Sequence, residues 1–173
     1  MDERTVMIVL RLIHILSGVF WAGGGMVLAW FVHPANRASG ESGPAFMRRL
    51  MLDYRLGAFF GLAMALTLLS GFGMYWRLSS LAGSEWFASR PAMVLGTGGI
   101  AAVLAAIIGM GNGSITGKKM TALGEAMKNS GSPPSAAQIA QMGALQGRLA
   151  AGARIASSLL IVATIAMAVA RYL

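Results

Sequence analysis

The chain has 173 residues, a formal net charge of +8 and no cysteine, and 56% of its residues are hydrophobic while only 12% are charged. Together with a mean hydropathy of +0.66, this composition excludes an ordinary soluble domain and predicts an integral membrane protein with a single domain, residues 1–173. Without cysteine, the chain cannot form disulfides, thiolate metal sites or a covalently attached c-type haem.

The apolar runs predict four membrane-spanning helices in an all-α bundle. They cover approximately residues 6–32, 56–76, 91–110 and 149–170, and each is long enough to cross roughly 30 Å of hydrocarbon. Aromatic side chains fall near the expected ends, where amphipathic rings prefer to lie: Trp30, Trp76, Trp86 and Tyr172. The first span follows two acidic residues and precedes no cleavage site, so we expect it to be retained rather than removed as a signal peptide.

The basic residues cluster between the apolar runs and predict an orientation. Nine of them flank or occupy the 33–55 and 111–148 connections, against five on the side of the two termini. The positive-inside bias therefore places the two longer connections in the cytoplasm and both termini outside, in a bacterial inner membrane. Because the basic residues follow the membrane spans instead of forming one patch, we do not expect nucleic-acid binding.

The longest connection, residues 111–148, has helical patterning of its own. Apolar residues fall on one face between Ile115 and Met127, which predicts a short amphipathic helix at the cytoplasmic surface. Gly131 and the following proline pair end it. Ser135 and Gln138 match a capping box, so a new helix is expected to start there and continue into the fourth span. This hairpin is a structured connector or a docking site for a partner.

Small residues mark the expected packing faces, because helices in lipid associate where their backbones can approach closely. These residues are Gly18, Ala22, Ala101, Ala105, Gly109, Ala156, Ala163 and Ala170. The glycine run 23–25 allows two interpretations: close packing against a neighbouring helix, or room for a flat cofactor against the backbone.

His14 is the main candidate functional residue, because an ionisable side chain inside a membrane span is costly unless it has a role. Arg11, Gly18 and Trp21 share its face at helical spacing. One interpretation is a neutral histidine that hydrogen-bonds a neighbouring helix while Arg11 extends to the outer surface. The other is a metal ligand, and for haem this means an axial ligand.

A second ligand for His14 has to come from outside the first helix. His33 is excluded, since 19 residues of helix separate the two histidines by about 28 Å. Met74, Met93 and Met167 lie near the outer ends of the other spans and could complete a haem site or, with His14, hold Cu(I). Each of these methionines can equally be a packing residue. A five-coordinate iron or a second copy of His14 are further possibilities.

No motif in the chain predicts catalysis by side chains. We find no carboxylate pair, nucleophile elbow, phosphate-binding glycine loop or zinc-type histidine pair. Acidic residues within the spans are too few for an evident proton relay. The sequence therefore does not predict a hydrolase, a phosphotransferase or an ion-driven transporter.

The first helix, R-L-I-H-I-L-S-G-V-F-W-A-G-G followed by Pro34 and Arg37, resembles the first helix of CopD-type copper-resistance membrane proteins and of HemJ-type protoporphyrinogen oxidases. It also resembles a related group of small four-helix membrane proteins, which the C-terminal AMAVARYL matches as well. The resemblance implies a haem- or porphyrin-associated bundle in which His14 is the key residue. The third span lacks the lysine of the HemJ-type pattern, which argues against porphyrinogen oxidation.

Three functions follow as expectations. The first is haem b binding through His14, with Arg11, Trp21, Met74, Met93 and Met167 as candidate cofactor-binding residues, in redox or porphyrin handling. The second is a cofactor-free structural or accessory subunit that packs against a homo-oligomer partner or a larger membrane complex. The third is copper handling by His14 and the outer methionines.

Overall fold

The computed structural model describes residues 2–40 and 42–173, and every element in these ranges is a helix. The all-α prediction is therefore confirmed. In the described residues, four helices are long and apolar enough to cross a membrane, namely Glu3–Ala38, Leu56–Ala82, Arg90–Asn129 and Ala136–Tyr172. By length and composition, the protein is built as a multi-pass membrane protein.

The first long helix contains α1 (Glu3–Gly18), α2 (Gly24–Val27) and α3 (His33–Ala38), joined by two wide π-helical turns, η1 (Val19–Gly23) and η2 (Leu28–Val32). Asp2 caps its start by accepting a hydrogen bond from the backbone N–H of Thr5. The helix was expected to end before Pro34 but continues to Ala38. The proline lies in the first turn of α3, directly after η2, where its missing N–H is tolerated.

Two short elements and a left-handed turn connect the first and second long helices. They are α4 (Ser42–Arg48) and the π-helical turn η3 (Arg49–Asp53), after which Arg55 adopts φ 53° and starts α5 (Leu56–Ala82). The second span was expected to end near Trp76, and α5 runs on for six more residues. Gly83, with φ 74°, then reverses the chain into the 3₁₀ turn η4 (Ser84–Ala88).

The last two long helices form an extended antiparallel hairpin, α6 (Arg90–Asn129) and α7 (Ala136–Val169), followed by the short η5 (Ala170–Tyr172). The predicted capping box is confirmed, since Gln138 N–H donates to Ser135 and the Gln138 side chain accepts from the Ser135 N–H. The separate surface helix after Gly113 is not confirmed. That segment is an unbroken continuation of the third span, held against α7 by contacts described below.

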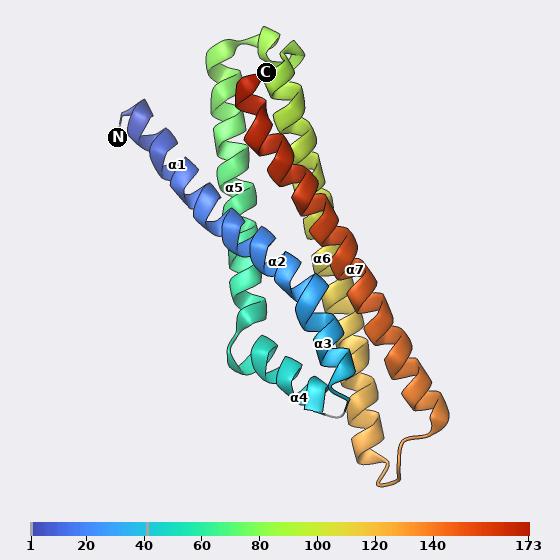
Figure 1. Cartoon of the computed structure of the whole chain (residues 1–173). Helices are drawn as coiled ribbons and strands as arrows, with labels where there is room; N and C mark the ends of the chain where they lie inside the picture. Colours follow the sequence, from blue (N-terminus) through green and yellow to red (C-terminus); the bar gives the residue numbers. More distant parts are fainter. Residues whose placement is uncertain (1, 41) are drawn as a thin grey trace.

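Figure 1 shows α5 and the α6–α7 hairpin side by side, with the first long helix crossing them obliquely. Its N-terminal part, α1, packs against α5, whereas α2 and η2 contact α7. The start of α1 is splayed away from the end of α7. Different neighbours therefore surround the two halves of this helix.

Small side chains dominate the core between these helices, as predicted. The buried cluster contains Trp21, Leu160 and seven alanines, and it includes four of the predicted packing residues: Ala101, Ala105, Ala156 and Ala163. A Cβ at Gly24 would lie 2.8 Å from the Phe60 ring, and one at Gly25 would lie 3.8 Å from Leu160. Close helix packing thus accounts for Gly24, whereas a Cβ at Gly25 would make only an ordinary contact.

Candidate functional site

His14 lies on the face of α1 that packs against α5. Its Nδ1 atom is 2.8 Å from the backbone carbonyl oxygen of Thr67 and 3.4 Å from Ser70 Oγ. A carbonyl can only accept, so Nδ1 carries the proton and donates to Thr67. The side chain is half-buried. The hydrogen bond to a neighbouring helix, one of the two interpretations of His14, is therefore present.

A notch in α5 accommodates the imidazole ring. A Cβ at Gly71 would stand 2.9 Å from His14 Cε1 and 3.1 Å from Nδ1, which is too close for any residue but glycine unless the ring moves. One turn toward the N-terminus of α1, Leu10 packs over Gly73, where a Cβ would make only an ordinary contact at 3.5 Å. Gly71 is therefore the glycine that lets α1 approach α5 closely at the level of His14.

Hydroxyl groups continue the contact between α1 and α5 on the C-terminal side of His14. Thr67 Oγ1 lies 2.9 Å from Ser17 Oγ and 2.7 Å from the Ala63 carbonyl, and Ser17 Oγ donates to the Ile13 carbonyl at 2.6 Å. Ser17, Thr67 and Ser70 are all buried. This group, called here the His14 network, consists of His14, Ser17, Thr67 and Ser70, and it links helices through polar bonds that water cannot replace inside a membrane.

The second ring nitrogen of His14 remains free. Within residues 2–40 and 42–173, Nε2 has no hydrogen-bond partner and is not among the fully enclosed polar atoms. Since Nδ1 holds the proton, Nε2 presents a lone pair. An accessible acceptor at membrane depth gains free energy from any donor or metal that reaches it.

The other predicted cofactor-binding residues are distributed over the bundle. Met74 lies on α5, three residues beyond Gly71, so it shares the helix that His14 contacts. Arg11 is exposed on α1, one turn nearer the N-terminus. Trp21 is 8% exposed and belongs to the alanine core. Of the three candidate methionines, Met74 is the one on the helix that His14 contacts.

Met93 and Met167 belong to the α6–α7 hairpin. The side chain of Met167 packs on α6, with Cε 3.3 Å from a Cβ built at Gly98. Met93, near the start of α6, is 53% exposed. The contact between Met167 and Gly98 joins α6 and α7 and does not involve α1. His33 is half-buried at the start of α3, far along the same long helix from His14, as the spacing requires.

The sequence interpretation missed the partners of His14 on α5. Thr67, Ser70 and Gly71 follow one another at spacings of three and one, so they occupy one helix face. That pattern of small and hydroxyl side chains was detectable in the second span. Its pairing with His14, 53 residues away, depends on how the two helices cross.

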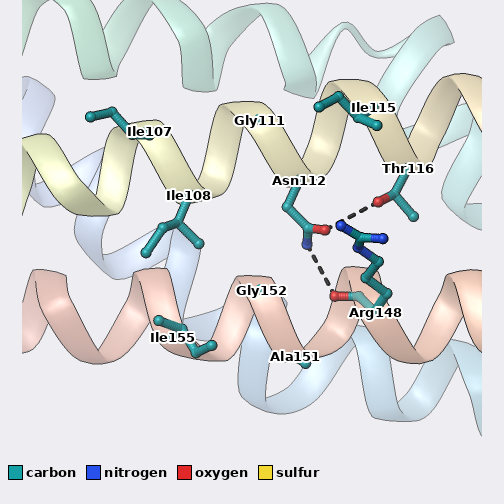
Figure 2. Close-up of a pocket in the computed structure, with 10 residues that line it drawn as sticks. All are labelled: Ile107, Ile108, Gly111, Asn112, Ile115, Thr116, Arg148, Ala151, Gly152 and Ile155. Carbon is teal, nitrogen blue, oxygen red and sulfur yellow. Dashed lines mark hydrogen bonds between the residues drawn. The ribbon is translucent and has the colours of Figure 1, made fainter.

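Asn112 forms a second polar contact between helices, which was also missed. Its Nδ2 donates to the backbone carbonyls of Arg148 and Leu149 at 3.1 and 3.2 Å, and its Oδ1 accepts from Thr116 at 3.1 Å (Figure 2). A Cβ at Gly152 would lie 2.0 Å from Nδ2, so only glycine admits the amide. Asn112 thereby holds α6 against α7 beyond the expected end of the third span.

No three His, Cys, Asp or Glu side chains gather into a metal-binding group in the part of the chain that the structure describes. A metal ion at His14 would therefore take its remaining ligands from a porphyrin, a thioether or another molecule. Family models, curated proteins and solved structures were compared with the chain, and none matches it.

Proposed function

We propose that this membrane protein binds a b-type haem through Nε2 of His14 and serves in electron transfer or porphyrin handling. The observation that carries the proposal is the state of the imidazole. Its Nδ1–H is fixed on the Thr67 carbonyl, and its Nε2 lone pair, within an apolar helix long enough to span a membrane, has no hydrogen-bond partner among the described residues and is not fully enclosed. The resemblance of the first helix to CopD-type and HemJ-type proteins points to the same residue.

Several residues around His14 would hold a haem if one were bound. Ligating histidines commonly donate their other ring N–H to a carbonyl, which fixes the ring orientation and increases the basicity of the ligating nitrogen. Here the Thr67 carbonyl has this role, and Gly71 provides the space for the ring. Arg11, one turn away and exposed, is placed to pair with a propionate. Met74 on α5 would be the candidate thioether ligand.

A bound haem would supply one-electron chemistry, and the protein would set its surroundings. The Thr67 carbonyl would orient the imidazole. We further propose that the membrane is the bacterial inner membrane, with both termini outside. His14 then lies in the outer half of the bilayer.

Absorption spectra of the purified protein in detergent, oxidised and reduced, test the haem proposal. We expect a Soret band that is lost in His14→Ala and kept in His33→Ala, the matched control on the same helix. Because haem is supplied during expression, a low supply of haem cannot explain a missing Soret band. A colourless wild-type protein under these conditions, or a Soret band that survives His14→Ala, contradicts the proposal.

A cofactor-free accessory subunit is the second candidate, and the exposed outer face of α1 favours it. Leu12 and Leu16 on α1 are 55% and 71% exposed, and Val19 at the start of η1 is 68% exposed. In the described residues, α1 packs mainly along α5, and its start splays from the end of α7 (Figure 1). Another membrane chain could pack on this outer face, which lies on the side of α1 opposite to His14. Colourless protein that co-purifies with a membrane partner, and loses it in Leu16→Ala but not in His14→Ala, supports this function.

Copper handling has less support from the geometry. It needs thioethers close to His14, and Met167 packs against Gly98 on α6 while Met93 lies near the start of α6. Stoichiometric copper in the purified protein, lost in Met93→Ala or Met167→Ala, would favour copper over haem.

A further inference from the structure

A shallow groove of about 350 Å³ lies between α6 and α7, at the level where the apolar part of the hairpin gives way to its polar part. Figure 2 shows Ile107, Ile108 and Ile155 toward one end of the groove and Thr116 and Arg148 toward the other. The isoleucine end belongs to the predicted spans and the polar end borders the connector 111–148. The groove therefore crosses the level at which lipid headgroups lie.

The groove carries one free positive charge. The polar atoms of Asn112 and Thr116 are already paired with each other and with the carbonyls of α7. The Arg148 side chain reaches from α7 toward α6 beside them (Figure 2), it is exposed, and it forms no salt bridge with any described residue. Its guanidinium can thus receive an anion with two parallel hydrogen bonds.

The surrounding charge favours an anionic ligand. Between residues 111 and 148 the chain has four basic residues and one acidic residue, Glu125. Lys118 and Lys119 follow Ile115 by three and four residues, so they extend the face of α6 that forms the groove. Both lysines are exposed. An anion at Arg148 would lie in a positive field extending along α6.

The apolar end of the groove indicates what the anion is attached to. Ile107 and Ile155 at this end are 60% and 53% exposed. Ile115, which lies beside Thr116 at the polar end, is 55% exposed and lines the same groove as the Arg148 side chain (Figure 2). We propose that this groove binds an anionic phospholipid, with its phosphate at Arg148 and one acyl chain along the isoleucines. Basic pockets between membrane helices bind acidic headgroups in this way. The site is independent of His14 and of the proposed haem.

Native mass spectrometry of the detergent-purified protein tests this proposal with phosphatidylglycerol and phosphatidylcholine of identical acyl chains. We expect the wild-type protein to retain phosphatidylglycerol in preference to phosphatidylcholine. Arg148→Gln should weaken phosphatidylglycerol binding roughly tenfold, the loss typical of one charge-assisted pair. Lys128→Gln, the matched control near the far end of α6, makes the same charge change and should leave binding within about twofold.

A second variant tests the groove without changing any charge. Ala151 is exposed and lines the groove, so Ala151→Phe should fill it and weaken phosphatidylglycerol binding as Arg148→Gln does. Neither change touches the Asn112 contacts, which use the backbone of Arg148, and circular dichroism should confirm the unchanged helix content.

Three results would overturn the proposal. The first is equal retention of phosphatidylglycerol and phosphatidylcholine by the wild-type protein. The second is an equal loss of phosphatidylglycerol binding in Arg148→Gln and in Lys128→Gln. The third is displacement of the lipid by millimolar inorganic phosphate, together with unchanged phosphatidylglycerol binding in Ala151→Phe. The last result would identify a free anion as the ligand.

Discussion

The α1–α5 contact and the α6–α7 contact join helices in different ways. In α6–α7, alanines of the buried cluster pack between residues 101–106 and 156–163, and the amide of Asn112 is paired at both its nitrogen and its oxygen. In α1–α5, buried hydroxyls and His14 carry the contact, and Nε2 stays unpaired. Well-packed, satisfied contacts serve stability, whereas an open polar group inside a membrane indicates a function or a partner. The comparison therefore separates scaffold from candidate site, with Ser157 on α7 as an exception, because its buried Oγ has no hydrogen-bond partner among the described residues.

The largest effect is expected at the Asn112 clamp. In Gly152→Ala the new Cβ would lie 2.0 Å from Nδ2 and 2.6 Å from Cγ of Asn112, so the amide must leave and both carbonyl bonds are lost. Overpacking together with unpaired polar groups should cost about 2–4 kcal/mol, measured by SDS titration in detergent. Gly147→Ala is the control, since a Cβ there meets nothing within 4 Å. Equal stability of the two variants would refute the clamp.

Gly71→Ala should have the next largest effect, because its Cβ displaces the His14 ring from the notch. We expect a loss of about 1–3 kcal/mol in the free energy of unfolding. Under the haem proposal, the Soret band should also shift or weaken. Gly61→Ala on the same helix, where a Cβ meets nothing within 4 Å, should change neither quantity. A shifted spectrum with unchanged stability would mean that the notch serves the cofactor alone.

A smaller effect is expected from Ser17→Ala, which removes one hydroxyl from the His14 network but leaves His14 bonded to Thr67. Hydrogen bonds between membrane helices contribute about 0.6 kcal/mol on average, so the unfolding transition should move only slightly. A double-mutant cycle with Thr67→Val measures the pair itself. A coupling free energy indistinguishable from zero would show that the two hydroxyls bond only to their own helices.

The smallest effect concerns the N-terminal cap. Hydrogen bonds from the side chain and backbone of Thr5 lower the pKa of Asp2 below its ordinary value. Because the folded pKa is depressed, the capping contribution is present above the unfolded pKa and is lost as the pH falls through the folded pKa. Amide exchange of the first turn of α1, corrected for intrinsic rates, should show fraying only in strongly acidic solution. Asp2→Asn keeps a good cap and should abolish this pH dependence.

Local sequence signals predicted the features that depend on neighbouring residues. The apolar runs located the long helices, and Ser135 with Gln138 located the start of α7, because a capping box is complete within four residues. The small residues located the packing faces. The ends of α5 and α6 were set too early, since hydropathy marks where a helix leaves lipid and not where it ends.

The candidate site was only half predictable, because its partners come from distant parts of the chain. His14 stood out as an ionisable residue in an apolar run, but its bond to Thr67 joins residues 53 apart in the sequence. The continuation of α6 depends on Asn112 meeting carbonyls 36 and 37 residues later. Both depend on helix crossings that no local pattern encodes.

The wide turn η1 determines which neighbour each half of the first helix faces. It contacts both α5 and α7, whereas α1 before it packs on α5 and α2 after it packs on α7. In an α-helix the side-chain direction rotates by about 100° around the axis from one residue to the next. One additional residue in a turn therefore changes the direction of every side chain that follows. Deleting one residue within 19–23 would therefore leave the residues of α1 and α2 unchanged. It would nevertheless rotate α1, and His14 with it, relative to the second half of the same helix.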